Sequence, residues 1–162
     1  MDGPVFCYDD GGRAAAGYRG RARDCAARAI AIATRRPYEE IYRALIREAA
    51  CDARGTRLNH PRTGLRKTTV QRFLSRLGWR WVEAPPAPHR RAISLRFEEL
   101  PAGRLIVALS THVCAVIDGV IYDTYDCSRG GRRRPYGYWS PHREWNRVGP
   151  RGIYPRGPPA NV

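Results

Sequence analysis

The chain has 162 residues, 43% hydrophobic and 27% charged, which is the composition of a globular protein long enough to bury a core without metal or disulfide staples. Its 29 Lys and Arg residues against 15 Asp and Glu give a net charge of +14, and Lys67 is the only lysine. No apolar run approaches the roughly 18 residues of a transmembrane helix, and the first residues lack the basic and apolar regions of a signal peptide. We therefore expect a cytoplasmic protein with no membrane partner.

Three helices are predicted in the first half of the chain, and the first covers residues 25–34. Asp24 is suited to cap it, because a carboxylate accepts hydrogen bonds from the free N–H groups of a first helical turn. Apolar residues cover nearly all sides of this helix and only Arg28 interrupts them, which is typical of a central, buried helix. The two further helices are predicted within residues 36–52 and 68–79.

The second half of the chain is predicted to be a sheet. Residues 79–84 form a short strand, residues 103–110 are a near-continuous β run, and residues 111–126 are two short β runs separated by Asp118-Gly119. An Asp-Gly pair between alternating apolar residues is a strong hairpin signal. Residues 135–141 are predicted as an edge strand. Helices first and an antiparallel sheet second give an α+β arrangement.

The five cysteines are odd in number and form no CxxC pair. This pattern argues against a disulfide framework and against a zinc knuckle, so we expect reduced thiols, most of them buried. The positions are Cys7, Cys25, Cys51, Cys114 and Cys127. We expect neither a metal ion nor an organic cofactor.

The predicted hairpin brings a histidine and an aspartate together. A two-residue turn at positions 118 and 119 places His112, Cys114, Asp123 and Tyr125 on one face, because side chains alternate along a strand. His112 and Asp123 become diagonal neighbours with Cα atoms about 7 Å apart, within reach of a hydrogen bond between imidazole and carboxylate. Such a bond fixes the imidazole tautomer and supports the imidazolium when it forms.

Cys25 supplies the nucleophile that this pair lacks. The N-terminus of a helix favours the thiolate, and the backbone N–H of Cys25 is an oxyanion donor. His112 then acts as the base and Asp123 as its orienting group. Cys114 is the alternative nucleophile, but a strand offers no helix dipole. A metal site of His112, Cys114 and Asp123 is a further alternative, in which three ligands on one hairpin face would crowd.

Three stretches in this order carry a family resemblance: RDCAARAIAIAT (23–34), PYEEIYRAL (37–45) and GRLIVALSTHVCAVIDGVIYDTYD (103–126). Together they resemble the papain-like cysteine peptidases, of the compact kind found in bacteria and phages. The resemblance covers about residues 20–126, and RPYGYW (134–139) also suits it. It implies an α+β fold with a buried central helix packed on a small antiparallel sheet. It also implies that Cys25 is the nucleophile, His112 the base and Asp123 the orienting acid.

The oxyanion site departs from the pattern of that family. Papain-like enzymes usually carry a glutamine shortly before the cysteine, whereas the only glutamine here is Gln71, in the third predicted helix. The candidate oxyanion donors are therefore the backbone N–H of Cys25 and the side chains of Arg19 and Arg23. Asp24 has two open roles, because it either caps the helix or raises the pKa of the neighbouring thiol.

The chain divides into an N-terminal arm (1–20), a papain-like catalytic domain (21–128) and a C-terminal extension (129–162) that is rich in Arg, Pro and Gly and contains the edge strand. The extension carries eight arginines and one acid, so it is also a candidate contact for an acidic or nucleic-acid partner. The candidates for the wall of a substrate groove are aromatic: Tyr125, Tyr138 and Trp139.

These inferences predict a cysteine hydrolase, either a peptidase or an isopeptidase, that acts on a peptide or protein through a thioester acyl-enzyme. Three alternatives remain open. The first is a related acyl-transfer enzyme, such as an amidase, transglutaminase or acyltransferase. The second is a non-catalytic binding or inhibitor protein on the same scaffold. The third is a basic protein that associates with nucleic acid through residues 129–162.

Overall fold

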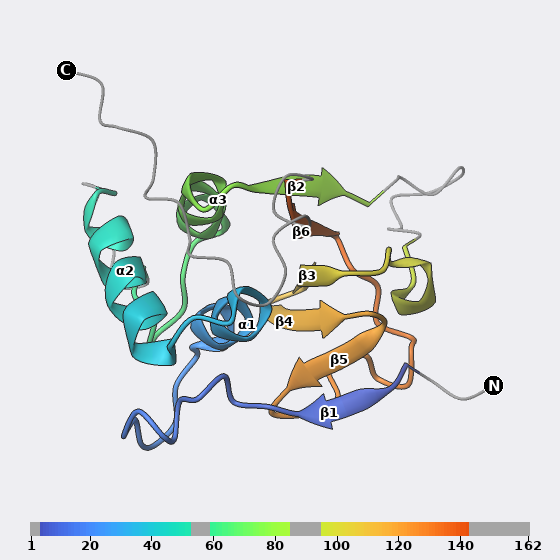
Figure 1. Cartoon of the computed structure of the whole chain (residues 1–162), viewed down its shortest axis with the longest axis horizontal. Coiled ribbons are helices and arrows are strands. Elements are labelled where there is room, and N and C mark those ends of the chain that lie inside the picture. The colour runs from blue at the N-terminus through green and yellow to red at the C-terminus, as the bar shows by residue number, and fades with distance from the viewer. Residues whose placement is uncertain (1–3, 53–58, 85–94, 143–162) are drawn as a thin grey trace.

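A six-stranded sheet with helices on one of its faces organises the fold (Figure 1). The structure is a computed structural model that describes residues 4–52, 59–84 and 95–142. Its helices are α1 (Cys25–Thr34), α2 (Tyr38–Ala50) and α3 (Lys67–Arg76), with one 3-10 turn, η1 (Phe97–Glu99). Its strands are β1 (Phe6–Tyr8), β2 (Trp79–Glu83), β3 (Arg104–Leu109), β4 (His112–Ile117), β5 (Val120–Asp123) and β6 (Gly137–Pro141). Within these described ranges, none of the helices is both long and apolar enough to cross a bilayer.

The strand order is β1-β5-β4-β3-β6-β2, and all neighbouring pairs are antiparallel except β1 with β5, which run parallel. The α+β class is therefore confirmed, but the sheet is mixed rather than antiparallel. The parallel pair arises because β1 comes from the N-terminal arm. The chain leaves β1, forms all three helices, and returns to the sheet before β5 is made, and a parallel pair requires such a long crossover.

The predicted hairpin forms in the predicted register. Ile117 pairs with Val120, and the next pairs along β4 and β5 are Val116 with Ile121 and Ala115 with Tyr122. Asp118 and Gly119 have φ angles of 49° and 81°, and a tight turn between twisted antiparallel strands requires positive φ at both positions. Asp118 also accepts a hydrogen bond at 2.8 Å from the backbone N–H of Gly103, which ties the turn to the start of β3.

The prediction of an edge strand in the C-terminal extension is wrong, because β6 lies inside the sheet between β3 and β2. Trp139 pairs with Ile106 on one side and with Trp81 on the other. At Gly137 a Cβ atom would lie 2.4 Å from the carbonyl oxygen of Val82, so only glycine allows the two strands to approach this closely. The predicted arm and the predicted extension thus both contribute strands to one sheet.

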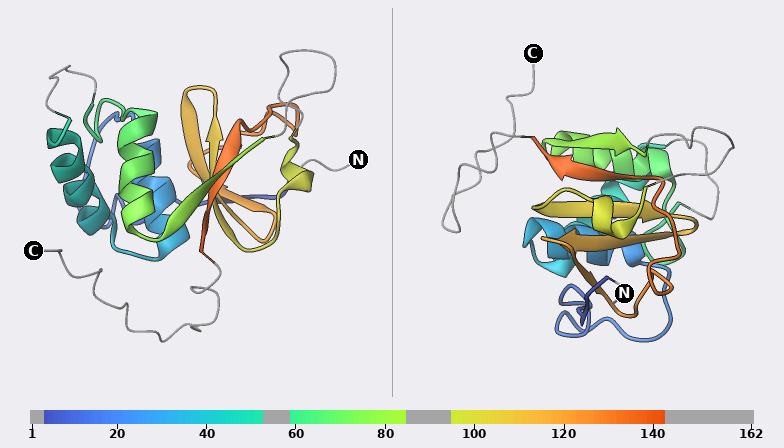
Figure 2. Two further views of the ribbon diagram at one scale, coloured as in Figure 1. Left: turned by 90° about the horizontal axis from the view of Figure 1, so that it is seen from above. Right: turned by 90° about the vertical axis from the view of Figure 1, so that its right-hand side faces the viewer.

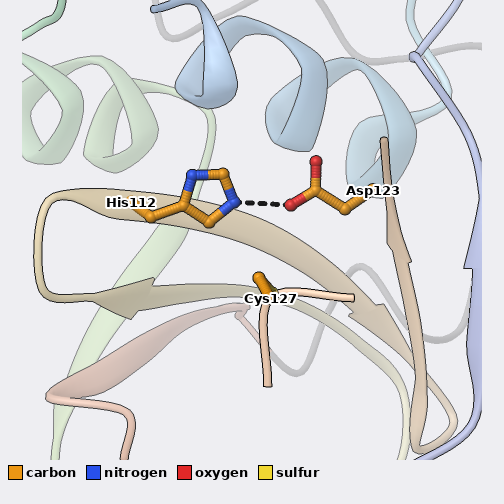
Figure 3. Close-up of side chains that lie close together, drawn as sticks. All are labelled: His112, Asp123 and Cys127. Atoms are coloured by element: carbon orange, nitrogen blue, oxygen red, sulfur yellow. Dashed lines mark hydrogen bonds and ion pairs between the residues drawn. The ribbon is translucent and has the colours of Figure 1, made fainter. Parts of the chain in front are cut away.

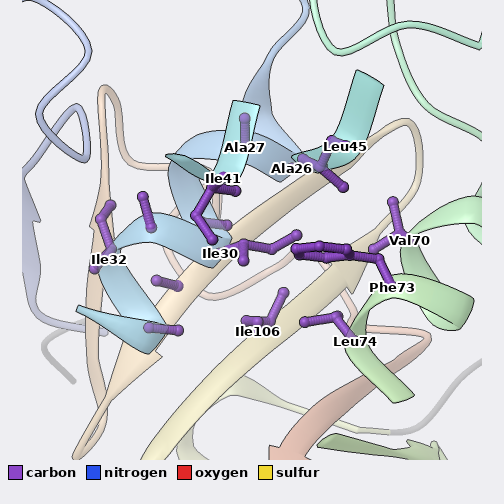
Figure 4. Packing of buried hydrophobic residues seen from close by; sticks show 14 of the residues in the cluster. Ala26, Ala27, Ile30, Ile32, Ile41, Leu45, Val70, Phe73, Leu74 and Ile106 are labelled. Carbon is purple, nitrogen blue, oxygen red and sulfur yellow. The ribbon is translucent and has the colours of Figure 1, made fainter. Parts of the chain in front are cut away.

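Helix α1 is the centre of the core, as predicted. It packs on β4 and β3 with one side and against α2 with another, and α3 closes the cluster around Ile30 and Phe73 (Figure 4). Seven of its ten residues are buried. The helices gather on one face of the sheet (Figure 2), while η1 and a second apolar cluster around Val107 and Val116 cover the opposite face. An all-round apolar helix fits this place because protein surrounds it.

Candidate active site

Cys25 is the first residue of α1 and lies over the start of β4. Burial alone raises the pKa of its thiol, but interactions with the ring of His112 and with the backbone of Val113, together with the positive charges of His112 and Arg28, outweigh the burial. The pKa of Cys25 is therefore lowered below its ordinary value.

His112 and Asp123 form the pair that the hairpin register predicts. The Nε2 atom of His112 lies 2.5 Å from Oδ2 of Asp123, and both side chains are buried (Figure 3). This contact occupies Nε2, so Nδ1 is the ring nitrogen that remains for the thiol of Cys25. The two side chains meet because His112 opens β4 and Asp123 ends its antiparallel neighbour β5, which brings them to the same end of the hairpin.

The protonation of His112 follows from its partners. Burial lowers the pKa of the imidazole, but hydrogen bonds to Asp123, Cys127 and Cys25, together with the negative charge of Cys25, raise it to about 11. A lowered thiol pKa and a raised imidazole pKa favour the charge-separated pair, a thiolate beside an imidazolium, at neutral pH. The arrangement therefore holds a reactive nucleophile beside a proton donor.

Asp24 does not cap α1, so the predicted helix cap is wrong. Its carboxylate makes no hydrogen bond to the first turn. Instead it is buried, at 3% exposure, and Oδ2 accepts hydrogen bonds from Arg13 Nε at 2.7 Å and from the hydroxyl of Tyr38 at 2.6 Å. Arg28 Nε lies 3.3 Å from Oδ1 as an ion pair. Two guanidinium groups thus balance the charge that we expected either to cap the helix or to oppose the thiolate.

Arg28 connects Asp24 to the hairpin. Its Nη1 atom donates to Oγ1 of Thr124 at 2.5 Å and lies 3.6 Å from Oδ1 of Asp123. The backbone N–H of Thr124 also donates to Oδ1 of Asp123, at 2.7 Å. One oxygen of Asp123 is therefore held by Arg28 and Thr124, which leaves the other directed at His112. The single charged side chain of the apolar α1 is the one that orients the acid of the site.

Cys127 lies on the loop that follows β5 and contacts His112 as well. Its thiol is fully buried and hydrogen-bonded to Cys114 and His112. The hydrogen bond from Cys114 is the largest cause that lowers the pKa of Cys127 to about 6, against burial, and the same contact raises the pKa of Cys114. Both thiols are too buried to meet a substrate, whereas Cys25 is partly exposed. Cys25 is therefore the better nucleophile of the three.

The aromatic residues predicted to line a groove separate into three environments. Tyr125 is 49% exposed, and its ring centroid lies 5.2 Å from that of His112, so it stands beside the site. Tyr138 is half-buried against the second apolar cluster. Trp139 is 1% exposed in the core, because β6 is an inner strand, so its predicted place in a groove is wrong. Residues 53–58 and 85–94 lie outside the described residues, as do residues 143–162 of the extension.

Two hydrogen bonds to backbone carbonyls hold the segment that leads into Cys25. The N–H of Arg23 donates to the carbonyl of Arg62 at 2.8 Å, and Nη2 of Arg13 donates to the carbonyl of Gly20 at 2.9 Å. The side chains of Arg19 and Arg23 are exposed, and their role as oxyanion donors stays a prediction. The N–H of Cys25 belongs to the first turn of α1, where backbone donors have no partner within the helix.

A metal ion has one candidate set of ligands in the described part of the chain. His112, Asp123 and Cys127 each offer a ligand atom, and these atoms all lie within 4.8 Å of one another. The alternative considered from the sequence contained Cys114 in place of Cys127.

Sequence reasoning missed Arg13, Arg28, Tyr38, Thr124 and Cys127 as members of the site. Arg28 carried a detectable signal, because it is a lone charge in an apolar helix, three residues after Cys25 and four after Asp24. Cys127 carried none, because its position depends on a loop. Comparison of the chain with models of protein families, with curated proteins and with solved structures gave no match.

Proposed function

We propose that the chain is a cysteine hydrolase of papain-like fold, a peptidase or isopeptidase that uses Cys25, His112 and Asp123. The observation that supports this most is that His112, which contacts the carboxylate of Asp123 at 2.5 Å, also interacts with the thiol of Cys25 and lowers its pKa. The lowered thiol pKa and the raised imidazole pKa add to it, because a thiolate beside an imidazolium is the reactive form of a catalytic cysteine.

In the first half of the reaction, the thiolate of Cys25 attacks the carbonyl carbon of an amide or isopeptide bond. The electron pair of the carbonyl moves to oxygen, and the free backbone N–H of Cys25 donates to that oxyanion. His112 then gives the proton on Nδ1 to the leaving amine as the C–N bond breaks. The acyl group remains on Cys25 as a thioester.

In the second half, the neutral His112 removes a proton from water, and the resulting hydroxide attacks the thioester carbonyl. The carboxylic acid leaves, and the thiolate and imidazolium are restored. Asp123 keeps the ring in place throughout, because its hydrogen bond to Nε2 fixes the imidazole while Nδ1 gives and takes the proton.

Alkylation tests the thiol directly. Iodoacetamide at pH 6 should label Cys25 well before the exposed thiols Cys7 and Cys51, as read by peptide mass spectrometry. The variant His112→Gln removes the imidazolium and should bring the rate at Cys25 down to that of the two reference thiols. Equal rates at all three cysteines in the unaltered protein would contradict the proposal.

A nitrophenyl ester tests for the acyl-enzyme. The unaltered protein should release one equivalent of nitrophenol in a burst and carry the acyl group on Cys25, whereas Cys25→Ser should do neither. Adding a primary amine distinguishes the hydrolase from the acyl-transfer alternative. If the amine captures nearly all of the acyl group at millimolar concentration, the enzyme is a transferase that uses the same residues.

The five free thiols favour a reducing compartment, and we propose the cytoplasm as the location of the protein.

A further inference from the structure

The proposed reaction leaves one buried thiol beside the active histidine unused. Figure 3 shows Cys127 close to the contact between His112 and Asp123. We propose that Nε2 of His112, Oδ2 of Asp123 and Sγ of Cys127 form a binding site for Zn²⁺, and that filling this site switches off the thiol of Cys25. The binding half of this proposal stands on the geometry alone, whereas the switching half rests on the proposed function.

The three ligand atoms fit the preferences of Zn²⁺. This ion takes thiolate, imidazole and carboxylate ligands in tetrahedral sites, and three protein ligands with one water is a common set. Zinc bond lengths of 2.0–2.3 Å place tetrahedral ligand atoms about 3.2–3.8 Å apart. The three atoms all lie within 4.8 Å of one another. Zinc therefore requires Nε2 of His112 and Oδ2 of Asp123, now 2.5 Å apart, to separate by about 1 Å.

The ligands are already held in place by neighbouring groups. The backbone N–H and the hydroxyl of Ser128 donate to Oδ1 of Asp126 at 2.9 and 2.6 Å, which fixes the turn that carries Cys127. Oδ1 of Asp123 is held by Thr124 at 2.7 Å, so Oδ2 is the oxygen free to leave His112 for a metal. Outer contacts of this kind orient ligands and raise the affinity of metal sites.

Zinc binding balances as an exchange of protons for the divalent ion. The ion replaces the proton on Nε2 of His112 and any proton that remains on the thiol of Cys127, and these protons leave to solvent. The imidazole then keeps a hydrogen only on Nδ1. The positive charge of the imidazolium then no longer stabilises the thiolate of Cys25, so its alkylation slows. The metal-bound imidazole also does not give up its Nδ1 hydrogen at neutral pH, so the leaving amine receives no proton. Zinc and acyl transfer therefore exclude each other at His112.

Cobalt and zinc titrations of the full chain test the site. The unaltered protein should bind one Co²⁺ with a sulfur-to-cobalt charge-transfer band and should bind one Zn²⁺ by calorimetry. Cys25→Ser and the matched control Cys51→Ser should keep the band, and Cys127→Ser should lose it and bind Zn²⁺ more than about tenfold more weakly. A band that survives Cys127→Ser, a band that disappears in Cys25→Ser, or no saturation by micromolar metal overturns the site.

Two further measurements keep the test independent of folding and of activity. If Cys127→Ser fails to fold, X-ray absorption at the zinc edge of Cys25→Ser decides, because one sulfur ligand supports the site and none overturns it. In the unaltered protein, one equivalent of Zn²⁺ should abolish the fast alkylation of Cys25, and Cys127→Ser should resist this loss. Unchanged alkylation with zinc bound overturns the switch. If Cys25 shows no fast alkylation at all, the proposed function fails, and the metal titration still decides the site.

Discussion

Replacing Arg28 with methionine removes the charge that joins the two buried acids of the site. The guanidinium lies 3.3 Å from Asp24 and 3.6 Å from Asp123, and its side chain is 12% exposed. Each ion pair at these distances has a gross Coulomb energy of about 5 kcal/mol at an effective dielectric constant of about 20. The change also removes the hydrogen bond to Thr124, and methionine keeps most of the apolar length of the arginine stem.

The net loss is smaller than the gross energy, because both acids keep other partners. Asp24 retains Arg13 and Tyr38, and Asp123 retains His112. Breaking a buried ion pair by removing one partner costs about 3–5 kcal/mol, and the lower end applies here. We therefore expect the free energy of unfolding to fall by about 3 kcal/mol, which for a chain of this size lowers the melting temperature by about 6–12 °C.

The same change acts on the thiol. The charge of Arg28 lowers the pKa of Cys25, so Arg28→Met should raise that pKa and slow alkylation at pH 6 more than at pH 9. Calorimetry and the pH profile of iodoacetamide labelling measure the two effects. Arg43→Met is the matched control, because Arg43 pairs with Glu39 on the surface of α2 and exposed pairs contribute at most about 1 kcal/mol. Arg28→Lys keeps the charge and should restore part of the rate at pH 6. The reasoning is refuted if Arg28→Met resembles Arg43→Met in both measurements.

Three more outcomes are expected. Asp123→Asn removes the carboxylate that stabilises the imidazolium of His112, so hydrolysis should slow by about 10²-fold or more, and a loss below threefold would show that Asp123 orients nothing. Ile30→Ala empties a fully buried position in α1 and should lower the free energy of unfolding by about 2–5 kcal/mol in urea titrations, whereas Ile46→Ala, at an exposed position of α2, should change it by less than about 1 kcal/mol. Because the folded-state pKa of Cys25 is depressed from 9.0, the stability that the unaltered protein has over Cys25→Ser should be fully present above pH 9 and be lost as pH falls through the lowered pKa. A stability difference that does not change with pH would contradict that pKa.

The parts of the site that the sequence predicted are those that local rules determine. The Asp118-Gly119 turn sets the register, and the register alone brings His112 to Asp123. The helix that begins at Cys25 follows from its apolar run. The roles of these residues stay a proposal, but the meeting of His112 and Asp123 was predictable from the local pattern of the hairpin.

The parts that the sequence did not predict depend on contacts between distant segments. Strand β1 is short and exposed, and its partner β5 lies in the other half of the chain, so no local pattern marks it. The local sequence of β6 predicts an edge strand. Strand β6 lies inside the sheet because β2, which is far from it along the chain, pairs with its outer side. Asp24 has a local reason to cap α1, but Arg13 and Tyr38 compete for its carboxylate, and their contact appears only in the folded chain.

The ionic groups along α1 are easier to explain by reactivity than by stability. Buried ion pairs are often no more stabilising than well-packed apolar residues of similar volume, and α1 is otherwise almost wholly apolar. Arg28 nevertheless interrupts the apolar sequence of α1. Its charge favours the thiolate of Cys25, and its guanidinium group forms an ion pair with Asp123. Two acids face two guanidinium groups, and a thiolate faces an imidazolium, so the site is close to neutral as a whole while each reacting atom sits beside an opposite charge. An apolar replacement would keep the packing and lose that polarity, which is why we assign these charges to the chemistry of the thiol.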